Sequence, residues 1–187
     1  VPDTCDSDSF RPQRLASPQS VAVAHDTRVA ARSAGYSKEQ EAVEVCARSM
    51  GGFDLRWEYH DASGNLVGIV LRRNLPGGKK TCRPISLIDG RWHLKGMPVP
   101  RPLYRLPELL ASDAPVIICE GEKATDAAIA CGYTATTSPH GSNSAKQADW
   151  SVLRDRDVII IPDLNEAGDA YAREVLFFSE SAKSVRV

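Results

Sequence analysis

Two stretches of the chain decide the fold: VIICEGEK at residues 116–123 and VIIIPDLNEAG at residues 158–168. Each begins as an apolar, largely β-branched run and stops at carboxylates, Glu120 in the first and Asp163 in the second. Short runs of this kind are typical of strands that are buried on both faces of a parallel sheet. If the two strands are neighbours, Glu120 and Asp163 lie at the same edge of the sheet. Such an edge is suited to holding a divalent cation against phosphate.

The 187 residues are enough for one ordinary domain or two small ones. No apolar run approaches the roughly 20 residues that a membrane-spanning helix needs, so we expect a protein without a membrane segment. The chain begins with Val1 rather than Met, and its first residues are rich in Ser, Asp and Pro. We therefore expect residues 1–35 to be a linker or partly ordered segment, with a helix over 21–33, in a piece of a longer protein.

The cysteines indicate the compartment. Their number is odd and none has CxxC spacing, which argues against a zinc ribbon. Cys119 falls in a predicted strand, and Cys131 falls on the apolar face of a predicted helix. We therefore expect buried, reduced thiols in a cytoplasmic protein. The five cysteines are Cys5, Cys46, Cys82, Cys119 and Cys131.

Residues 36–111 are predicted to form a small α+β subdomain with an antiparallel sheet. The capping-box pattern at 37–40 predicts a helix that ends at Gly51-Gly52. Residues 55–60 alternate with period two, 61–65 have turn chemistry, and 66–72 read as a second strand, so the pair predicts a hairpin. One or two short strands are expected over 84–94, and a short helix over 106–111.

This first region carries a dense basic cluster. Between residues 72 and 105 only Asp89 opposes the basic side chains, whereas acidic residues outnumber basic ones from Leu106 onward. The cluster predicts a surface for a phosphate backbone, and the alternative is a solvated sheet face. Trp57, Tyr59 and Trp92 lie among these residues and could stack on bases or belong to the core. The basic residues are Arg72, Arg73, Lys79, Lys80, Arg83, Arg91, Lys95, Arg101 and Arg105.

Residues 112–187 alternate strands and helices, which predicts a parallel sheet with flanking helices and right-handed crossovers. Strands are expected at 116–119, 133–137, 157–161 and from 184 onward. Helices are expected at 123–131, with Ala124, Ala127, Ala128 and Cys131 on its packing face, and at 144–153 and 166–179. Sites in such sheets lie beyond the carboxyl ends of the strands, where Glu120, loop 138–143 and Asp163 fall.

Two carboxylates at neighbouring strand ends repel one another unless a proton or cation lies between them. Mg²⁺, or Mn²⁺ in its place, suits such a pair because it takes oxygen ligands and bridges to phosphate. Glu120 could instead act as a general acid or base, or both carboxylates could merely cap helices. Gly121 would permit a tight turn, and Lys123 at the helix start could pair with a phosphate.

The spacing of these residues resembles the Toprim domain of bacterial-type primases, topoisomerases and some nucleases. The similarity consists of Glu120-Gly121-Glu122-Lys123 after one strand and Asp163-x-Asn165-x-x-Gly168 after a later strand. Residues 59–73, 102–109 and 137–142 also resemble segments of phage and plasmid primase-helicase proteins. The resemblance implies a Toprim-like sheet over 112–187, a metal held by Glu120, Asp163 and Asn165, and template held beside it by the basic subdomain.

One position departs from this pattern, because Asn165 stands where the family usually has a second aspartate. An amide oxygen can ligate Mg²⁺ but brings no charge, so affinity for a second metal should fall. Glu122, Glu166 or Asp169 could compensate. The remaining candidates for phosphate or nucleotide are Gly121, Lys123, Ser138, His140, Ser142, Asn143, Lys146 and Gly168. The candidates for nucleic acid are Arg72, Arg73, Lys79, Lys80, Arg83, Arg101 and Arg105.

The resemblance implies a DNA primase core from a mobile-element or phage-type replication protein, which joins ribonucleotides on single-stranded DNA by Mg²⁺-dependent phosphoryl transfer. Two alternatives stay open: a non-catalytic DNA-binding module, favoured by Asn165, and a metal-dependent nuclease. No P-loop pattern occurs in the sequence, so a helicase motor would belong to a domain or protein outside this chain.

Overall fold

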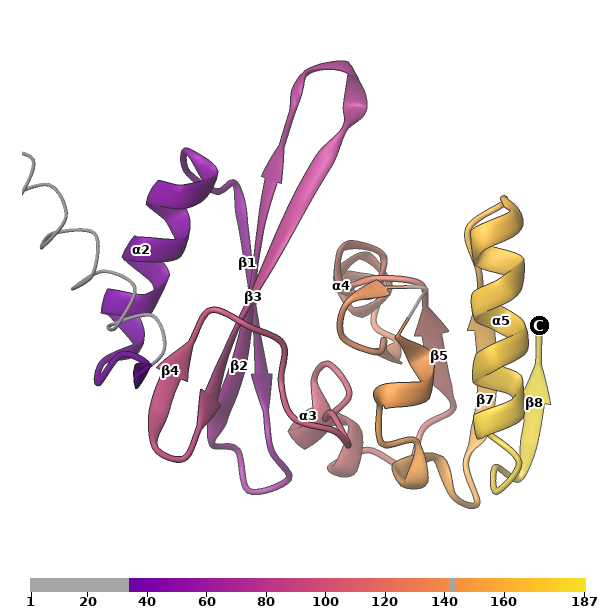
Figure 1. Cartoon of the computed structure of the whole chain (residues 1–187). Helices are drawn as coiled ribbons and strands as arrows, with labels where there is room; N and C mark the ends of the chain where they lie inside the picture. The colour runs from indigo at the N-terminus through magenta and orange to yellow at the C-terminus, as the bar shows by residue number, and fades with distance from the viewer. Residues whose placement is uncertain (1–33, 142–143) are drawn as a thin grey trace, which may run out of the picture. The chain divides into compact units, whose positions relative to one another are not determined.

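The computed structural model describes residues 34–141 and 144–187, and the linker, the helix at 21–33 and Cys5 expected in the N-terminal segment lie outside them. Residues 35–187 form one compact unit. It holds two four-stranded sheets, one antiparallel with the order β1-β2-β3-β4 and one parallel with the order β6-β5-β7-β8 (Figure 1). The predicted α/β class, with an antiparallel sheet preceding a parallel one, is confirmed.

Helix α2 (Glu39–Met50) packs its buried residues Ala42, Val43 and Cys46 against the antiparallel sheet. The predicted capping box is wrong: the N-cap is Lys38, with no side-chain cap, because Ser37 stands one residue too early for its hydroxyl to serve as the cap. The predicted end is confirmed. Gly51 takes a left-handed conformation (φ 75°), and the N–H of Gly52 closes the last turn on the carbonyl of Ala47.

The antiparallel sheet consists of β1 (Leu55–His60), β2 (Leu66–Asn74), β3 (Lys80–Ile88) and β4 (Arg91–His93). The predicted hairpin is confirmed, and the β2–β3 pair extends past the end of β1 (Figure 1). Strand β3 is longer than expected and contains Pro84. Strand β4 pairs only with Ser86–Ile88, so at Pro84 the edge of β3 that faces away from β2 has no partner strand. A proline, which lacks an N–H, is tolerated at such an edge.

Strand alternation divides this sheet into two chemically different faces. Ile69, Leu71 and Ile85 point toward α2 and form a core with it. The opposite face carries Trp57, Val70 and Pro84, which the register aligns in one row across β1, β2 and β3. Aromatic residues therefore serve as core, because Trp57, Tyr59 and Trp92 are all buried.

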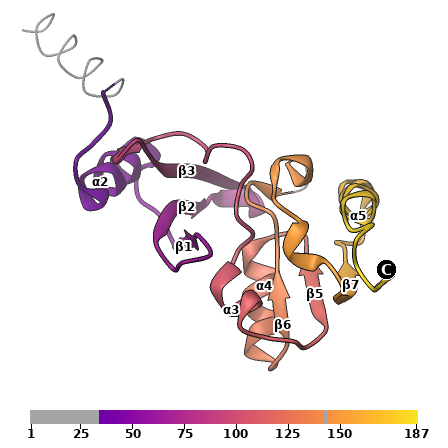
Figure 2. The ribbon, with the colours of Figure 1, turned by 90° about the horizontal axis from the view of Figure 1, so that it is seen from below.

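The parallel sheet consists of β5 (Val116–Cys119), β6 (Thr134–Thr136), β7 (Asp157–Ile161) and β8 (Ser184–Arg186). Helices α4 (Glu122–Ala130) and α5 (Glu166–Phe178) cover its two faces, and α3 (Leu106–Leu110) precedes it (Figure 2). Val116 and Ile118 pack on the α5 side, and Ile117 and Cys119 on the α4 side, so every residue of β5 is buried. This double burial explains the unbroken apolar run that identified the strand.

The helix predicted over 144–153 is wrong, because two short 3₁₀ turns, Ala145–Gln147 and Ser151–Leu153, stand there instead. A long-range bridge interrupts the helix. The N–H of Arg101 donates to the carbonyl of Gln147, and the N–H of Asp149 donates to the carbonyl of Arg101, which holds Ala148 extended. Tertiary pairing here overrides local helix propensity.

The predicted packing face of α4 is confirmed at Ala128 and wrong at Ala124 and Ala127, which are exposed. Thr125 and Ile129 face the sheet beside Ala128. Cys131 caps the helix and is exposed, so its predicted burial is wrong, whereas that of Cys119 is confirmed. Within residues 34–141 and 144–187, no helix combines the length and the apolar character needed to cross a membrane.

Candidate active site

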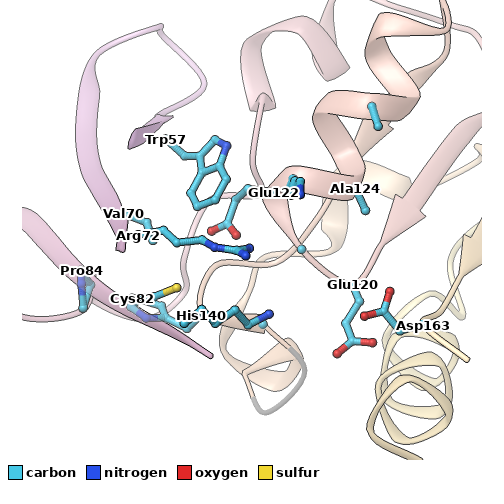
Figure 3. A pocket seen from close by; sticks show the side chains of 15 residues that line it. Trp57, Val70, Arg72, Cys82, Pro84, Glu120, Glu122, Ala124, His140 and Asp163 are labelled. Atoms are coloured by element: carbon cyan, nitrogen blue, oxygen red, sulfur yellow. The ribbon is translucent and has the colours of Figure 1, made fainter. Parts of the chain in front are cut away.

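Glu120 and Asp163 lie at neighbouring strand ends. Strands β5 and β7 pair in parallel with Cys119 opposite Ile161, so Glu120 directly follows one strand and Asp163 follows the other after a single proline. Figure 3 shows both carboxylates extending into the same part of a cavity. The pairing of β5 with β7 fixes the point at which each chain segment leaves the sheet. It therefore fixes the position of each carboxylate.

The carboxylate of Glu120 lacks a complete set of partners. Its Oε2 is buried and, within the described part of the chain, no hydrogen-bond donor reaches it. A buried carboxylate oxygen without a partner is costly, and a second carboxylate nearby adds repulsion. A cation between Glu120 and Asp163 would relieve both effects, so the residues present fit a divalent metal that keeps most of its water ligands.

The cation site would draw on few protein ligands. Among the residues that the structure describes, no three His, Cys, Asp or Glu side chains gather around one point. The side chain of Asn165 is already engaged: its Oδ1 accepts a hydrogen bond of 3.0 Å from the N–H of Gly168 and caps α5. Asn165 also does not line the cavity. Its predicted role as a metal ligand therefore stays a prediction that competes with its role as a helix cap.

The structure gives a steric reason for glycine at position 168, which the sequence pattern alone does not. A Cβ added there would overlap the backbone carbonyl of Asp163, so only glycine lets the first turn of α5 pack on this segment. Gly121 differs, because its φ of −159° suits any residue and a Cβ there would meet open space. The chain does bend at residues 120–121, but the bend does not require glycine there, and Gly121 lines the cavity.

The cavity beside the carboxylates has a volume of about 690 Å³. The strand-end region contributes Glu120, Gly121, Glu122, Lys123 and Asp163, and the antiparallel sheet contributes Arg72 and Lys80. The structure thus brings three carboxylates and three basic side chains to one cavity. Such a constellation can hold a metal–phosphate group and oppose its charge.

The other predicted nucleic-acid residues do not line this cavity, and strand register explains two of them. Arg73 and Arg83 fall on the α2 face of the sheet, opposite to Arg72. The guanidinium of Arg73 donates to the carbonyl of Met50 at the end of α2. The basic cluster in the sequence is therefore not one surface, because alternate residues of a strand point to opposite faces.

Arg101, Arg105 and Lys79 also lie outside the cavity lining. Arg101 donates from Nε to the carbonyl of Met97, and burial lowers its pKa. Arg105 pairs with Glu108 at 2.9 Å and lies over the ring of Tyr104. Among the predicted phosphate contacts, Lys146 is exposed but does not line the cavity, and Ser138 is buried beside Tyr171. Ser142 and Asn143 lie outside the described residues.

Helix α4 carries two carboxylates whose roles the sequence did not show. Asp126 accepts hydrogen bonds from the indole N–H of Trp57 (2.7 Å) and from the hydroxyl of Tyr104 (2.9 Å). Glu122 accepts from the hydroxyl of Tyr59 (2.8 Å), and burial raises the pKa of Glu122. These bonds join α4 to the antiparallel sheet. The four-residue spacing of Glu122 and Asp126 was a signal that both face one direction, but it did not reveal their partners.

His140 stands in the loop after β6 and lines the cavity. Its backbone is left-handed (φ 72°), and its buried Nε2 has no hydrogen-bond partner among the described residues. Burial, assisted by the charge of Arg101, lowers the pKa of His140 to about 4. His140 is therefore neutral at pH 7 and brings no positive charge to phosphate.

Comparison with known proteins gives a structural resemblance without a family. No protein-family model and no curated protein sequence matches the chain. Among solved structures, the chain resembles one from an assembly of bacteriophage T7 lagging-strand DNA polymerase interacting with primase domains of two gp4 subunits bound to an RNA/DNA hybrid and dTTP. The TM-score is 0.46 at 17% identity, and the match covers 71% of this chain. It covers 64% of the other chain, less than two thirds of its length, and does not assign an activity.

Proposed function

We propose that this chain is the catalytic core of a DNA primase with a Toprim-like site, which joins ribonucleotides on a single-stranded DNA template. One observation carries the proposal: Glu120 and Asp163 follow adjacent parallel strands in one cavity, and Glu120 keeps a buried oxygen without a partner. The motif resemblance, with glutamate after one strand and Asp163 through Gly168 after a later one, supports the same assignment.

In this function Glu120 and Asp163 hold the metal. A bound Mg²⁺ supplies charge neutralisation and orientation for phosphate groups. Lys123 in the first turn of α4 adds a cation, and the positive end of the helix dipole favours phosphate nearby. Phosphoryl transfer of this kind depends mainly on positioning and electrostatics, which are the properties that rigid strand ends provide.

The same assignment indicates which residues contact the template and which further domain the protein works with. Arg72 and Lys80 extend from the antiparallel sheet to the cavity and are the best-placed basic residues to contact a template strand. Arg73 and Arg83, on the α2 face, are poor candidates. The protein would act in the cytoplasm with a helicase domain or protein outside this chain, and residues 36–111 would be its template-binding subdomain.

A primer-synthesis assay tests the proposal with Glu120→Gln and Asp163→Asn, which keep side-chain size and remove charge. Loss of a residue that supports a metal ligand commonly costs about 10–100-fold, so loss of the ligand itself should lower synthesis at least about 100-fold. Asp113→Asn and Glu180→Gln are matched controls, since both residues are exposed and neither lines the cavity. Undiminished synthesis by both site variants would refute the assignment.

Asn165 supports a second candidate, a Toprim-like module that binds DNA without chemistry. Its oxygen caps α5 and its amide adds no charge to the site. Asn165→Asp keeps a good helix cap and should raise Mn²⁺ affinity in a titration. Strong Mn²⁺ binding by the unaltered chain would count against the non-catalytic reading. A nuclease sharing the same carboxylates is distinguished by its product, shortened DNA rather than new RNA.

A further inference from the structure

Two parts of the cavity wall consist of small or apolar side chains that the proposed chemistry does not use. On one side, α4 presents Ala124 and Ala127, which are exposed to the cavity instead of packed on the sheet. On the other side, strand β3 presents Cys82 and Pro84, and the register places Arg72 and Val70 of β2 directly beside them. Figure 3 shows Ala124 on the helix and Cys82 and Pro84 on the sheet.

The polar half lies at the strand ends, where Glu120, Lys123 and Asp163 line the same cavity. The cavity thus joins a metal- and phosphate-binding end to wall segments of small and apolar side chains, which matches a ligand with several charges at one end and a flat ring at the other. A nucleoside triphosphate has this form. The volume of about 690 Å³ lies within the range of small-molecule sites.

We infer that the space between these two wall segments is the base-binding subsite of the incoming nucleotide, with the base between Ala124 and Ala127 of α4 and Cys82 and Pro84 of β3. This inference rests on the proposed function and adds the orientation of the substrate. Alanine suits the helix wall because its side chain ends at Cβ and leaves room for a planar ring. These four side chains offer no strong hydrogen-bonding group, so purines should bind better than pyrimidines through their larger area. Arg72, Lys80 and Glu122 line the same cavity and are available to contact the edge of a base.

Cys82 provides a reporter inside the subsite. The full chain is alkylated with iodoacetamide at mildly alkaline pH, because burial raises the pKa of this thiol, and each cysteine is followed by peptide mass spectrometry. ATP with Mn²⁺ should suppress alkylation of Cys82 in proportion to the occupied fraction. Cys131, exposed and outside the cavity lining, should react at an unchanged rate. Tripolyphosphate with Mn²⁺, which has phosphates but no base, should leave Cys82 reactive.

A pair of helix variants provides the matched test. Ala127→Leu fills the subsite and should weaken ATP protection of Cys82 while leaving tripolyphosphate binding, measured by calorimetry, unchanged. Ala130→Leu makes the same change on the same helix at an exposed position outside the cavity lining and should behave as the unaltered chain. Leucine is nearly as good a helix former as alanine, so both variants should fold.

The outcomes separate this inference from the function on which it rests. Equal protection of Cys82 by tripolyphosphate and by ATP would place phosphates over Cys82, beside Arg72, and overturn the subsite. ATP binding that Ala127→Leu leaves unchanged would overturn it as well. Protection by ATP in a chain that makes no primer would uphold the subsite and refute the primase assignment. Primer synthesis without protection would do the reverse.

Discussion

His140 shows how one residue can be held in an unfavourable state by its surroundings. Its left-handed backbone and its buried, unpartnered Nε2 are both costly for a histidine. The depressed pKa follows from the same burial, because the interior and the nearby Arg101 disfavour the charged imidazolium. Conformations that cost stability cluster at functional sites, so the loop at His140 supports a functional role for the cavity beside it.

The lowered pKa of His140 predicts a loss of stability in mild acid. A histidine with a pKa near 6.5 when unfolded and about 4 when folded binds protons less well in the folded protein. The free energy of unfolding should therefore be highest above pH 6.5 and should fall as the pH is lowered toward 4, by at most about 3 kcal/mol from this residue. Urea unfolding at several pH values measures this slope.

The matched variants are His140→Asn, which tolerates the left-handed backbone, and His60→Asn in β1. The first should flatten the decline between pH 6.5 and 4, whereas the second should retain it. A decline of equal steepness in the unaltered chain and in His140→Asn would show that other groups cause it.

At the scale of elements, α5 and the segment after β7 form one packed structure. The first turn of α5 is capped by Asn165 and lies so close to Asp163 that position 168 has no room for a side chain. The helix therefore positions the carboxylate, and the Asp-x-Asn-x-x-Gly pattern describes packing as much as chemistry. The glycine is needed for the contact even though glycine lowers the stability of a helix interior.

Gly168→Ala tests this contact. Better helix propensity should stabilise α5 by about 1 kcal/mol, whereas overlap with the Asp163 carbonyl should cost about 1–3 kcal/mol or displace that segment. We expect a lower melting temperature and weaker Mn²⁺ binding together. Gly121→Ala, with open space around its Cβ, should lower the melting temperature less than Gly168→Ala does, because it creates no overlap and loses only the preference for glycine over alanine at the N-cap of α4. A stable Gly168→Ala that binds Mn²⁺ normally would show that α5 does not position Asp163.

The sequence predicts some elements better than others, because it shows patterns among nearby residues but not contacts between residues that are far apart in the chain. The sequence predicts strands β5 and β7 because each is a local apolar run that ends at Glu120 or Asp163, although only β5 is buried along its whole length and Ile161 of β7 is exposed. Charge density in the sequence places Arg73 with Arg72 because it takes no account of strand register. Ala124 and Ala127 predict a packing face that the structure leaves exposed, because alanine suits both a tight interface and an open cavity wall. The bridge between Arg101 and Ala148 joins distant segments and leaves no local pattern.

At the scale of the whole molecule, a few buried polar contacts join the two sheets. Asp126 of α4 accepts hydrogen bonds from Trp57 in the antiparallel sheet and from Tyr104 in the connecting segment, and both donors are nearly inaccessible to water. The rings of Tyr59 and Tyr104 also pack against each other in a tilted arrangement, with 5.4 Å between their centroids. A buried donor without an acceptor is costly, so these bonds couple the folding of residues 36–111 to that of 112–187.

Asp126→Ala should uncouple the two sheets, because it leaves the Trp57 and Tyr104 donors buried without an acceptor, at about 1–3 kcal/mol each. In native-state hydrogen exchange the unaltered chain should protect β2 and β3 to the same free energy as β5 and β7, since one global opening exposes all four. In the variant, β2 and β3 should exchange earlier, whereas β5 and β7 retain their own core around Ile118 and Ile160. Asp113→Asn, at the amino end of β5, should leave the pattern unchanged. Different protection of the two sheets in the unaltered chain would instead mean that the predicted boundary at 111/112 separates independent domains. An equal fall in the protection of both sheets in Asp126→Ala would show that other contacts suffice to couple them.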